Sequence, residues 1–163
     1  AVKNEGYYAF LESSESPVLA RYTKRDDPVY TDSCLEVFIA PVSGRSEYIN
    51  FEMNPNGAYL SQFGSERNGR VFIKELTAET PRVSAGVYTD KKGWHAQLFI
   101  PERLISSLYG CDFSVGEGEI RGNFYKCADD SPNPHYGALF PVDSVSLGFH
   151  NPERFGTIKI IKR

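Results

Sequence analysis

The fold class of this chain follows from residues 48–57, which read YINFEMNPNG. Side chains alternate between the two faces of a β-strand, and one face here is apolar, with Ile49, Phe51 and Met53. The opposite face carries the polar set Tyr48, Asn50, Glu52 and Asn54. The Asn-Pro-Asn-Gly end is a turn, because Asn and Gly tolerate a positive φ. Residues 48–63 therefore predict a β-hairpin with one core face and one polar face.

Short strand-like segments continue on both sides of this hairpin. They are residues 7–12, 18–23, 35–39, 83–89, 94–100, 120–127 and 157–161. Residues 64–70 predict a loop, and residues 90–93 a second hairpin turn. Residues 101–108 predict one short helix, since Pro101 stands in the first turn of an apolar stripe. Together these segments predict an all-β fold, an antiparallel β-sandwich of jelly-roll or immunoglobulin-like type, as a single domain over residues 1–163.

The composition suits this fold and argues against some kinds of partner. Aromatic residues make up 13% of the chain, and 14 Gly and 10 Pro provide for many turns. The net charge of −3 argues against nucleic acid as a partner. No stretch is apolar for long enough to span a bilayer, and no signal peptide is visible.

Three of the predicted strands carry polar side chains in phase. If residues 35–39, 48–54 and 120–127 are neighbours, one polar surface forms from Glu36, Tyr48, Asn50, Glu52, Arg121, Asn123 and Tyr125. Carboxylates, amides and Arg can satisfy sugar hydroxyls, and Tyr can cover an apolar sugar face. We expect a carbohydrate site here, to which His135 of a long loop contributes. The alternative is an ordinary solvated sheet face, on which Arg121 pairs with Glu36 or Glu52.

Five segments taken together resemble the family 9 carbohydrate-binding modules and their single-domain bacterial relatives. They are residues 32–39, 48–57, 94–101, 121–127 and 149–156, so the resemblance runs from about Arg21 to the end of the chain. It implies a β-sandwich that binds sugar on a sheet face or its edge loops, with structural calcium in some members. It also implies export to the periplasm, the cell surface or the medium, and a link with glycan breakdown.

The chain departs from the sugar-binding members of that family in its aromatic residues. Those members clamp a sugar between tryptophans, whereas this chain has one tryptophan, Trp94. Trp94 is in phase with three apolar residues of its strand, which predicts a place in the core. The residues that would have to replace the tryptophans are Tyr30, Tyr48, Tyr125 or Tyr136.

A metal site and a disulfide are further expectations. Asp129 and Asp130 lie in an oxygen-rich loop suited to a hard cation such as calcium. Cys34 and Cys127 fall on strands that we expect to be neighbours, so they could form a disulfide. Cys111 would then be the odd thiol.

Two other functions stay open beside a non-catalytic carbohydrate-binding module. A glycoside hydrolase would use a pair of carboxylates, for which Glu36 and Glu52 are the natural choice. A structural or interaction module would bind no sugar and would show an apolar patch on its surface. We expect the carbohydrate-binding module.

Overall fold

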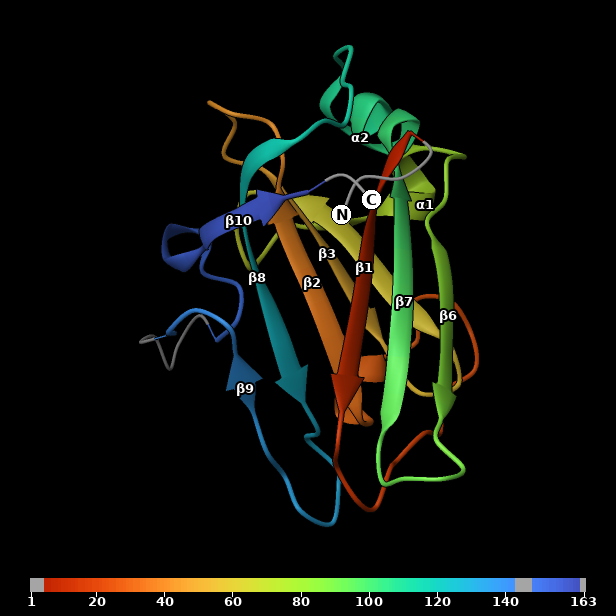
Figure 1. The fold of residues 1–163 in the computed structure, drawn as a ribbon. Helices are drawn as coiled ribbons and strands as arrows, with labels where there is room; N and C mark the ends of the chain where they lie inside the picture. Colours follow the sequence, from red (N-terminus) through yellow and green to blue (C-terminus); the bar gives the residue numbers. More distant parts are fainter. Residues whose placement is uncertain (1–4, 143–147, 162–163) are drawn as a thin grey trace.

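The computed structural model describes residues 5–142 and 148–161, which form two antiparallel β-sheets packed face to face (Figure 1). The smaller sheet has the strand order β1 (Gly6–Ser13), β7 (Trp94–Pro101), β6 (Arg82–Val87). The larger sheet has the order β10 (Gly156–Ile160), β8 (Gly118–Cys127), β2 (Cys34–Ala40), β3 (Tyr48–Met53), β4 (Tyr59–Gly64), β5 (Val71–Phe72), and β9 (Gly137–Ala138) pairs with β8. The helical elements are α1 (Ile73–Leu76), α2 (Glu102–Tyr109) and the 3-10 turns η1 (Val29–Thr31) and η2 (Pro152–Arg154). The predicted antiparallel β-sandwich is confirmed.

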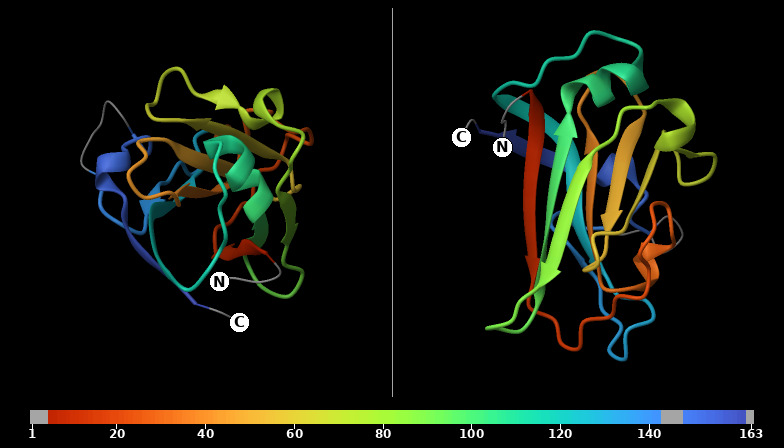
Figure 2. Two further views of the ribbon diagram at one scale, coloured as in Figure 1. Left: turned by 90° about the horizontal axis from the view of Figure 1, so that it is seen from above. Right: turned by 90° about the vertical axis from the view of Figure 1, so that its right-hand side faces the viewer.

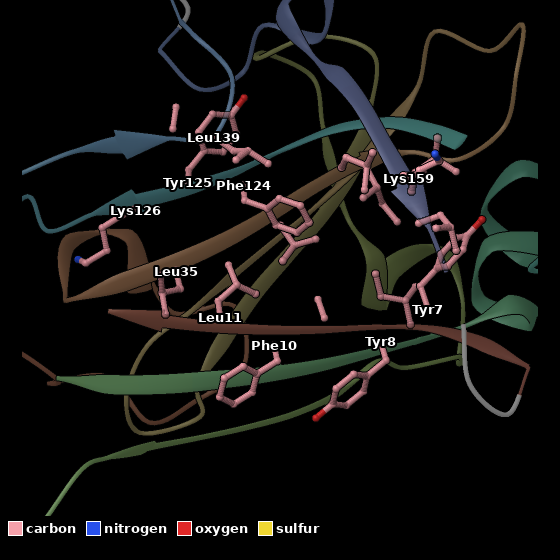
Figure 3. A pocket seen from close by; sticks show the side chains of 18 of the residues that line it. Tyr7, Tyr8, Phe10, Leu11, Leu35, Phe124, Tyr125, Lys126, Leu139 and Lys159 are labelled. Atoms are coloured by element: carbon pink, nitrogen blue, oxygen red, sulfur yellow. The ribbon is translucent and has the colours of Figure 1, made fainter. Parts of the chain in front are cut away.

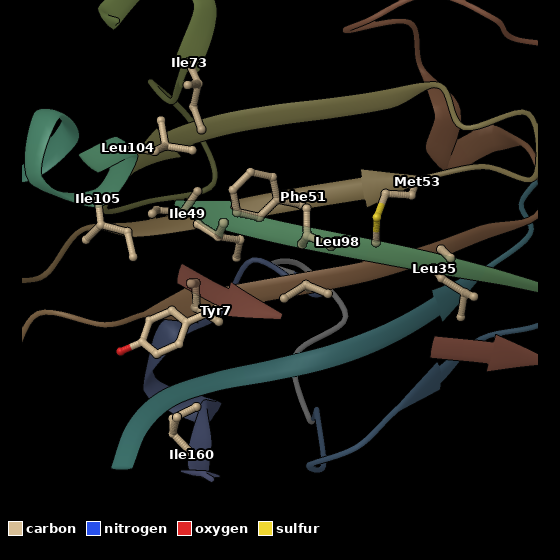
Figure 4. Close-up of a cluster of buried hydrophobic side chains, with 14 of the residues drawn as sticks. Tyr7, Leu35, Ile49, Phe51, Met53, Ile73, Leu98, Leu104, Ile105 and Ile160 are labelled. Carbon is tan, nitrogen blue, oxygen red and sulfur yellow. The ribbon is translucent and has the colours of Figure 1, made fainter. Parts of the chain in front are cut away.

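The core lies between the sheets and is built from the apolar faces of their strands. Figure 4 shows side chains of both sheets meeting there, among them Leu98 of β7, Phe51 of β3 and Leu35 of β2. Removal of this apolar surface from water is the main stabilising term of the fold. Trp94 at the start of β7 is 0% exposed, so its predicted place in the core is confirmed.

The helix α2 closes one end of the core. Pro101 stands just before its first residue, where the missing N–H costs no hydrogen bond. Leu104 and Ile105 are fully buried against the strands. Gly110 ends the helix in the left-handed region, at φ 62°, which glycine adopts without a steric penalty. The helix predicted at residues 101–108 is confirmed.

The turn between β3 and β4 is held by the side chain of its first residue. Asn54 Oδ1 accepts hydrogen bonds from the backbone N–H of Asn56 at 3.2 Å and of Ala58 at 3.1 Å. Gly57 has φ 77°, as the Asn-Gly pair predicts. The hairpin register then places Gln62 of β4 opposite Asn50 of β3.

The prediction of a strand at residues 18–23 is wrong. The backbone of this segment bonds to the turn that follows it rather than to a strand. Leu19 N–H donates to Ser33 Oγ at 2.9 Å, and Arg21 N–H donates to Asp32 Oδ2 at 2.8 Å. The short elements β5, β9 and α1 were not predicted, because two to four residues are too few to show a period.

The larger sheet is covered on both faces. Two segments, residues 18–33 and 148–155, cross its second face and form what we call the outer layer (Figure 2, right). Val29 joins Leu60 of β4 in one buried cluster. Phe155 packs on Phe38 and Tyr48 in another, with ring centroids 6.5 and 5.4 Å apart. As a result all six residues of β3 are buried, although their sequence alternates between apolar and polar.

Candidate functional site

The three strands expected to share a polar surface are neighbours, in the order β8, β2, β3. Their register places Glu36 of β2 opposite Glu52 of β3 on one side and opposite Tyr125 of β8 on the other. Asn50 and Asn123 both lie opposite Phe38 of β2 in the same way. The structure therefore brings the polar faces of the three strands together.

This polar face lies beneath the outer layer. Glu36 is 2% exposed, Glu52 is 3% exposed and Asn50 is fully buried. The ring of Phe149 from the outer layer stacks on Tyr125, with centroids 4.2 Å apart and planes at 8°. The face is thus an enclosed polar layer rather than a solvated sheet surface.

The side chains of β8 on this face hold both the outer layer and the chain just after β9 in place. Arg121 Nη2 donates to three backbone carbonyl oxygens in and just after η2, at 2.9 to 3.2 Å. The alternative, in which Arg121 pairs with Glu36 or Glu52, does not hold, because the guanidinium is directed to these carbonyl oxygens instead. Asn123 bonds to the backbone N–H and carbonyl of Phe140, each at 3.0 Å, and Tyr125 donates to Phe149 O at 3.0 Å.

Glu36 and Glu52 form a pair of buried acids. Cys127 Sγ donates to Glu36 Oε1 at 2.9 Å, and Asn50 Nδ2 donates to Glu52 Oε1 at 2.9 Å. Burial raises the pKa of Glu52 to about 7. The pKa of Glu36 is also raised well above its ordinary value, first by burial and then by its acidic neighbours Cys127 and Glu52. Both groups are therefore poised to hold a proton near neutral pH.

A further polar group on this side of the sheet, which we call the Arg70 cluster, consists of Tyr48, Gln62, Arg70 and His150. Arg70 Nη1 donates to Tyr48 Oη at 3.1 Å, and Arg70 Nη2 donates to Gln62 Oε1 at 3.2 Å. Arg70 Nη2 also lies 3.1 Å from His150 Nε2, and Tyr48 Oη lies 2.9 Å from His150 Nδ1. Tyr48 is buried, whereas the other three are partly exposed. The cluster therefore reaches the surface.

The protonation of His150 fixes the direction of these hydrogen bonds. Burial and the neighbouring charge of Arg70 lower the pKa of His150 to about 3, so its ring is neutral. A guanidinium can only donate, so His150 Nε2 accepts from Arg70 and the ring proton is on Nδ1. Nδ1 then donates to Tyr48 Oη, which already accepts from Arg70. The hydroxyl proton of Tyr48 has no acceptor among the residues described here.

Two more polar atoms at this place are unsatisfied. Within the described ranges, Asn50 Oδ1 and Arg70 Nε are buried and have no hydrogen-bond partner. Such atoms are rare in folded proteins and call for a water molecule or a ligand. Asn50 Oδ1 supplies an acceptor, while Arg70 Nε and the Tyr48 hydroxyl supply donors. All three groups are closed off from solvent, so an enclosed water molecule can satisfy them.

The sequence interpretation missed Arg70 and Gln62. Gln62 had a signal, because the hairpin register places it beside Asn50 on the polar face. Arg70 had none, since it lies in a polar stretch expected to be a loop. His150 belongs to a segment whose resemblance to the family was noted, but its contacts with Arg70 depend on the tertiary fold.

The predicted loop residues lie apart from these contacts. His135 Nδ1 bonds to Asn133 O at 2.7 Å, and His135 Nε2 is 3.5 Å from the carboxylate of Glu15. Asp130 forms an ion pair with Arg21 at 2.8 Å, which already neutralises one of the two predicted calcium ligands. Calcium binding by Asp129 and Asp130 and sugar binding by His135 stay predictions.

The cysteines are all free thiols in this structure. Cys34 of β2 and Cys127 of β8 are buried directly opposite each other, which confirms that their strands are neighbours. No disulfide joins them. Cys111 is exposed.

An apolar cavity of about 890 Å³ lies at the open side of the sandwich, between β1 and the strands β8 and β10 (Figure 3). Phe10, Leu139 and Ile161 on its rim are 49%, 60% and 55% exposed. Glu12 and Lys126 are among its polar lining residues, but most of the lining is apolar, so the cavity suits sugar hydroxyls poorly. It is the apolar patch by which an interaction module would be recognised.

None of the helices in the described residues is long and apolar enough to cross a membrane. The described part of the chain therefore offers no helical membrane span.

Comparison with known proteins identifies the family to which the sequence is similar. The sequence model of carbohydrate-binding family 9 matches residues 7–160, which is nearly the whole chain. A search of curated proteins finds no significant match. The match to the family model thus rests on the whole sandwich rather than on one motif.

Two solved structures share this architecture. A Bacteroides uniformis protein proposed to bind carbohydrate has a TM-score of 0.72 and 24% identity, over 93% of this chain and 71% of that chain. A family 9 carbohydrate-binding module from Caldicellulosiruptor kristjanssonii, solved in complex with glucose, has a TM-score of 0.60 and 17% identity, over 96% and 71% of the two chains. At such identities the likeness shows a common fold. Because the family model spans both sheets, this chain belongs to carbohydrate-binding family 9.

Proposed function

We propose that this chain is a non-catalytic module that binds an oligo- or polysaccharide, and that the sugar binds at the Arg70 cluster. Membership of carbohydrate-binding family 9 and the glucose complex of a structural neighbour support sugar as the ligand class. The observation that carries the proposal is that Gln62, Arg70 and His150 form a hydrogen-bonded polar group that reaches the surface above the enclosed face.

The mixture of donors and acceptors favours a sugar over a charged ligand. An anion needs donors alone and an ammonium needs acceptors alone, whereas neighbouring sugar hydroxyls both donate and accept. The cluster supplies both kinds within one small area. The partly exposed Gln62 amide can donate to one sugar hydroxyl and accept from another, while Arg70, whose Nη atoms bond within the chain, holds Gln62 and His150 in place. Glu52 and Asn50, both predicted as ligand residues, lie in the layer directly beneath.

Family membership also supports a proposal about where the chain works. We propose that the chain works outside the cytoplasm, in the periplasm, on the cell surface or in the medium, beside enzymes that break down glycans. Its role there would be to hold the polysaccharide near those enzymes.

Binding to a glycan array, followed by calorimetry with each glycan that binds, tests the proposal. We expect Arg70→Lys, which keeps the charge but loses the planar fork, and Gln62→Ala to weaken binding at least tenfold at unchanged melting temperature. Arg103→Lys is the matched control, because Arg103 is exposed and pairs with Glu79. A wild-type chain that binds no glycan would refute the function. Full affinity in both variants would refute the site alone.

Glycoside hydrolysis is the second candidate, and the raised pKa values of Glu36 and Glu52 favour it. A general acid needs a carboxyl that keeps its proton near neutral pH. Against it, both carboxyls lie beneath the outer layer and are at most 3% exposed, which leaves them out of reach of a polymer. Release of reducing sugar from a polysaccharide, lost in Glu52→Gln, would establish hydrolysis; we expect no release.

A further inference from the structure

A cluster of acidic donor atoms lies at the end of the enclosed polar face where β2 begins and β8 ends. Cys34 and Glu36 are two residues apart on β2 and therefore point to the same side, and Cys127 of β8 is opposite Cys34. The two sulfur atoms and a Glu36 carboxylate oxygen all lie within 4.8 Å of one another. All three residues are buried.

The backbone adds a fourth donor atom. Cys127 Sγ lies 2.9 Å from Glu36 Oε1 and 3.3 Å from the carbonyl oxygen of Tyr30, at the centre of the turn η1. The outer layer thus closes the cluster from above with an oxygen atom. The three side-chain donors and this backbone oxygen come from three separate segments of the chain.

Among the described residues, no basic side chain bonds to the acids of this cluster. The nearby cation, Lys126, directs its ammonium group to Cys127 O at 2.6 Å and to the Glu15 carboxylate at 3.1 Å. Glu52 lies opposite Glu36 and adds a further acid. Three acidic groups are thus buried together within a small space. Buried groups of this kind are ordinarily paired or bind a metal ion.

We propose that Cys34, Cys127 and Glu36 bind a thiophilic divalent cation such as Zn²⁺, with Tyr30 O beside the fourth position. Tetrahedral zinc with bonds of about 2.3 Å to sulfur and 2.0 Å to oxygen needs donor atoms about 3.3–3.8 Å apart. Cys127 Sγ lies 2.9 Å from Glu36 Oε1 and 3.3 Å from Tyr30 O, and no two of the three side-chain donors are more than 4.8 Å apart. These distances lie on both sides of the required range, so rotations of the side chains can bring the donors to zinc-binding distances. The ion joins β2, β8 and the outer layer.

The charge balance makes binding depend on pH. Two thiols and one carboxylic acid release three protons when Zn²⁺ binds, which leaves the site with one net negative charge. Because protons and the metal compete for the same atoms, affinity rises as the pH rises. This site does not depend on the proposed sugar function, and its loss would leave the Arg70 cluster unchanged.

Cobalt titration of the reduced chain tests the site. The protein is purified with a reductant and EDTA, freed of both, and titrated with Co²⁺, whose thiolate complexes absorb in the near ultraviolet. We expect one ion per chain, displaced by Zn²⁺, and one bound zinc in native mass spectrometry. The Cys111→Ser control should keep the band, and Glu36→Gln should keep it with at least tenfold weaker affinity.

The double variant Cys34→Ser/Cys127→Ser should lose the band while its circular dichroism shows a folded chain. Absence of metal uptake by the folded, reduced wild-type chain overturns the proposal, even if the variants fail to fold. Persistence of the band in the double variant also overturns it. So does a Cys34–Cys127 disulfide, seen as a mass two hydrogens lower, in a chain isolated without reductant.

Discussion

Replacement of Glu52 by Gln should stabilise the protein at alkaline pH and leave it nearly unchanged in mild acid. Burial raises the pKa of Glu52 from its ordinary value of 4.5 to about 7 in the folded chain. The folded state therefore holds a proton that the unfolded state loses between these values. The stability due to this proton is complete below pH 4.5 and is lost as the pH rises through 7. The pKa difference corresponds to about 3 kcal/mol by pH 8.

Gln keeps the shape of Glu52 and the hydrogen bond from Asn50, but it cannot ionise. The extra N–H of its amide gives an offset that is the same at every pH, so the pH dependence is the informative quantity. The free energy of unfolding is measured by urea denaturation from pH 5 to 8 with EDTA and a reductant present. The control is Glu75→Gln, at an exposed position of α1. If the difference between Glu52→Gln and wild type changes by less than about 0.5 kcal/mol from pH 5 to 8, Glu52 does not titrate as the structure requires.

Three other perturbations test the packing and charge of the sandwich. Gly122→Ala places its Cβ 2.4 Å from Phe38 O and should lower the free energy of unfolding by about 1–3 kcal/mol. The control is Gly137→Ala, whose Cβ would lie at an ordinary contact distance and should cost far less. Equal denaturation midpoints for the two variants would contradict the close approach at Gly122. The fluorescence of Trp94 should be blue-shifted and resist acrylamide quenching until the chain unfolds, and Trp94→Ala should cost about 3–5 kcal/mol. His150 stays neutral in the folded chain down to about pH 3, whereas in the unfolded chain it gains a proton below about pH 6.5, so stability should fall as the pH drops below about 6.5. His150→Gln should lose this part of the pH dependence. If the free energy of unfolding of variant and wild type falls in parallel between about pH 6.5 and 3, the neutral state of His150 is contradicted.

The strands that could be predicted are those in which apolar and polar residues alternate along the strand itself. Residues 48–57 show alternation and an Asn-Gly turn, and both are local properties that the fold preserves. The phase of Trp94 likewise placed it correctly in the core. Residues 18–23 also look strand-like, but their backbone partners are the side chains of Asp32 and Ser33, which local patterning cannot reveal.

The environment of the polar face could not be predicted for a related reason. A polar residue beneath an outer layer has the same sequence pattern as one in water. Glu52 is enclosed only because segments far away in the chain cross over it. The Arg70 cluster combines residues from four separate places in the sequence, so no spacing rule could have brought Arg70 and His150 together. The set of residues on the face was predictable, while its solvent exposure was not.

The way the chain passes between the two sheets has a consequence for its synthesis. The hydrogen bond from Tyr8 to Gln97 joins β1 to β7 across 89 positions, and that from Cys127 to Glu36 joins β8 to β2 across 91. Neither sheet can be completed from one contiguous half of the polypeptide. On the ribosome, β1 must wait unpaired until β7 has emerged, and β2, although it can pair with β3 early, keeps its other edge open until β8 has emerged. Long-range pairing of this kind folds slowly, which makes the nascent domain a substrate for chaperones that shield strand edges.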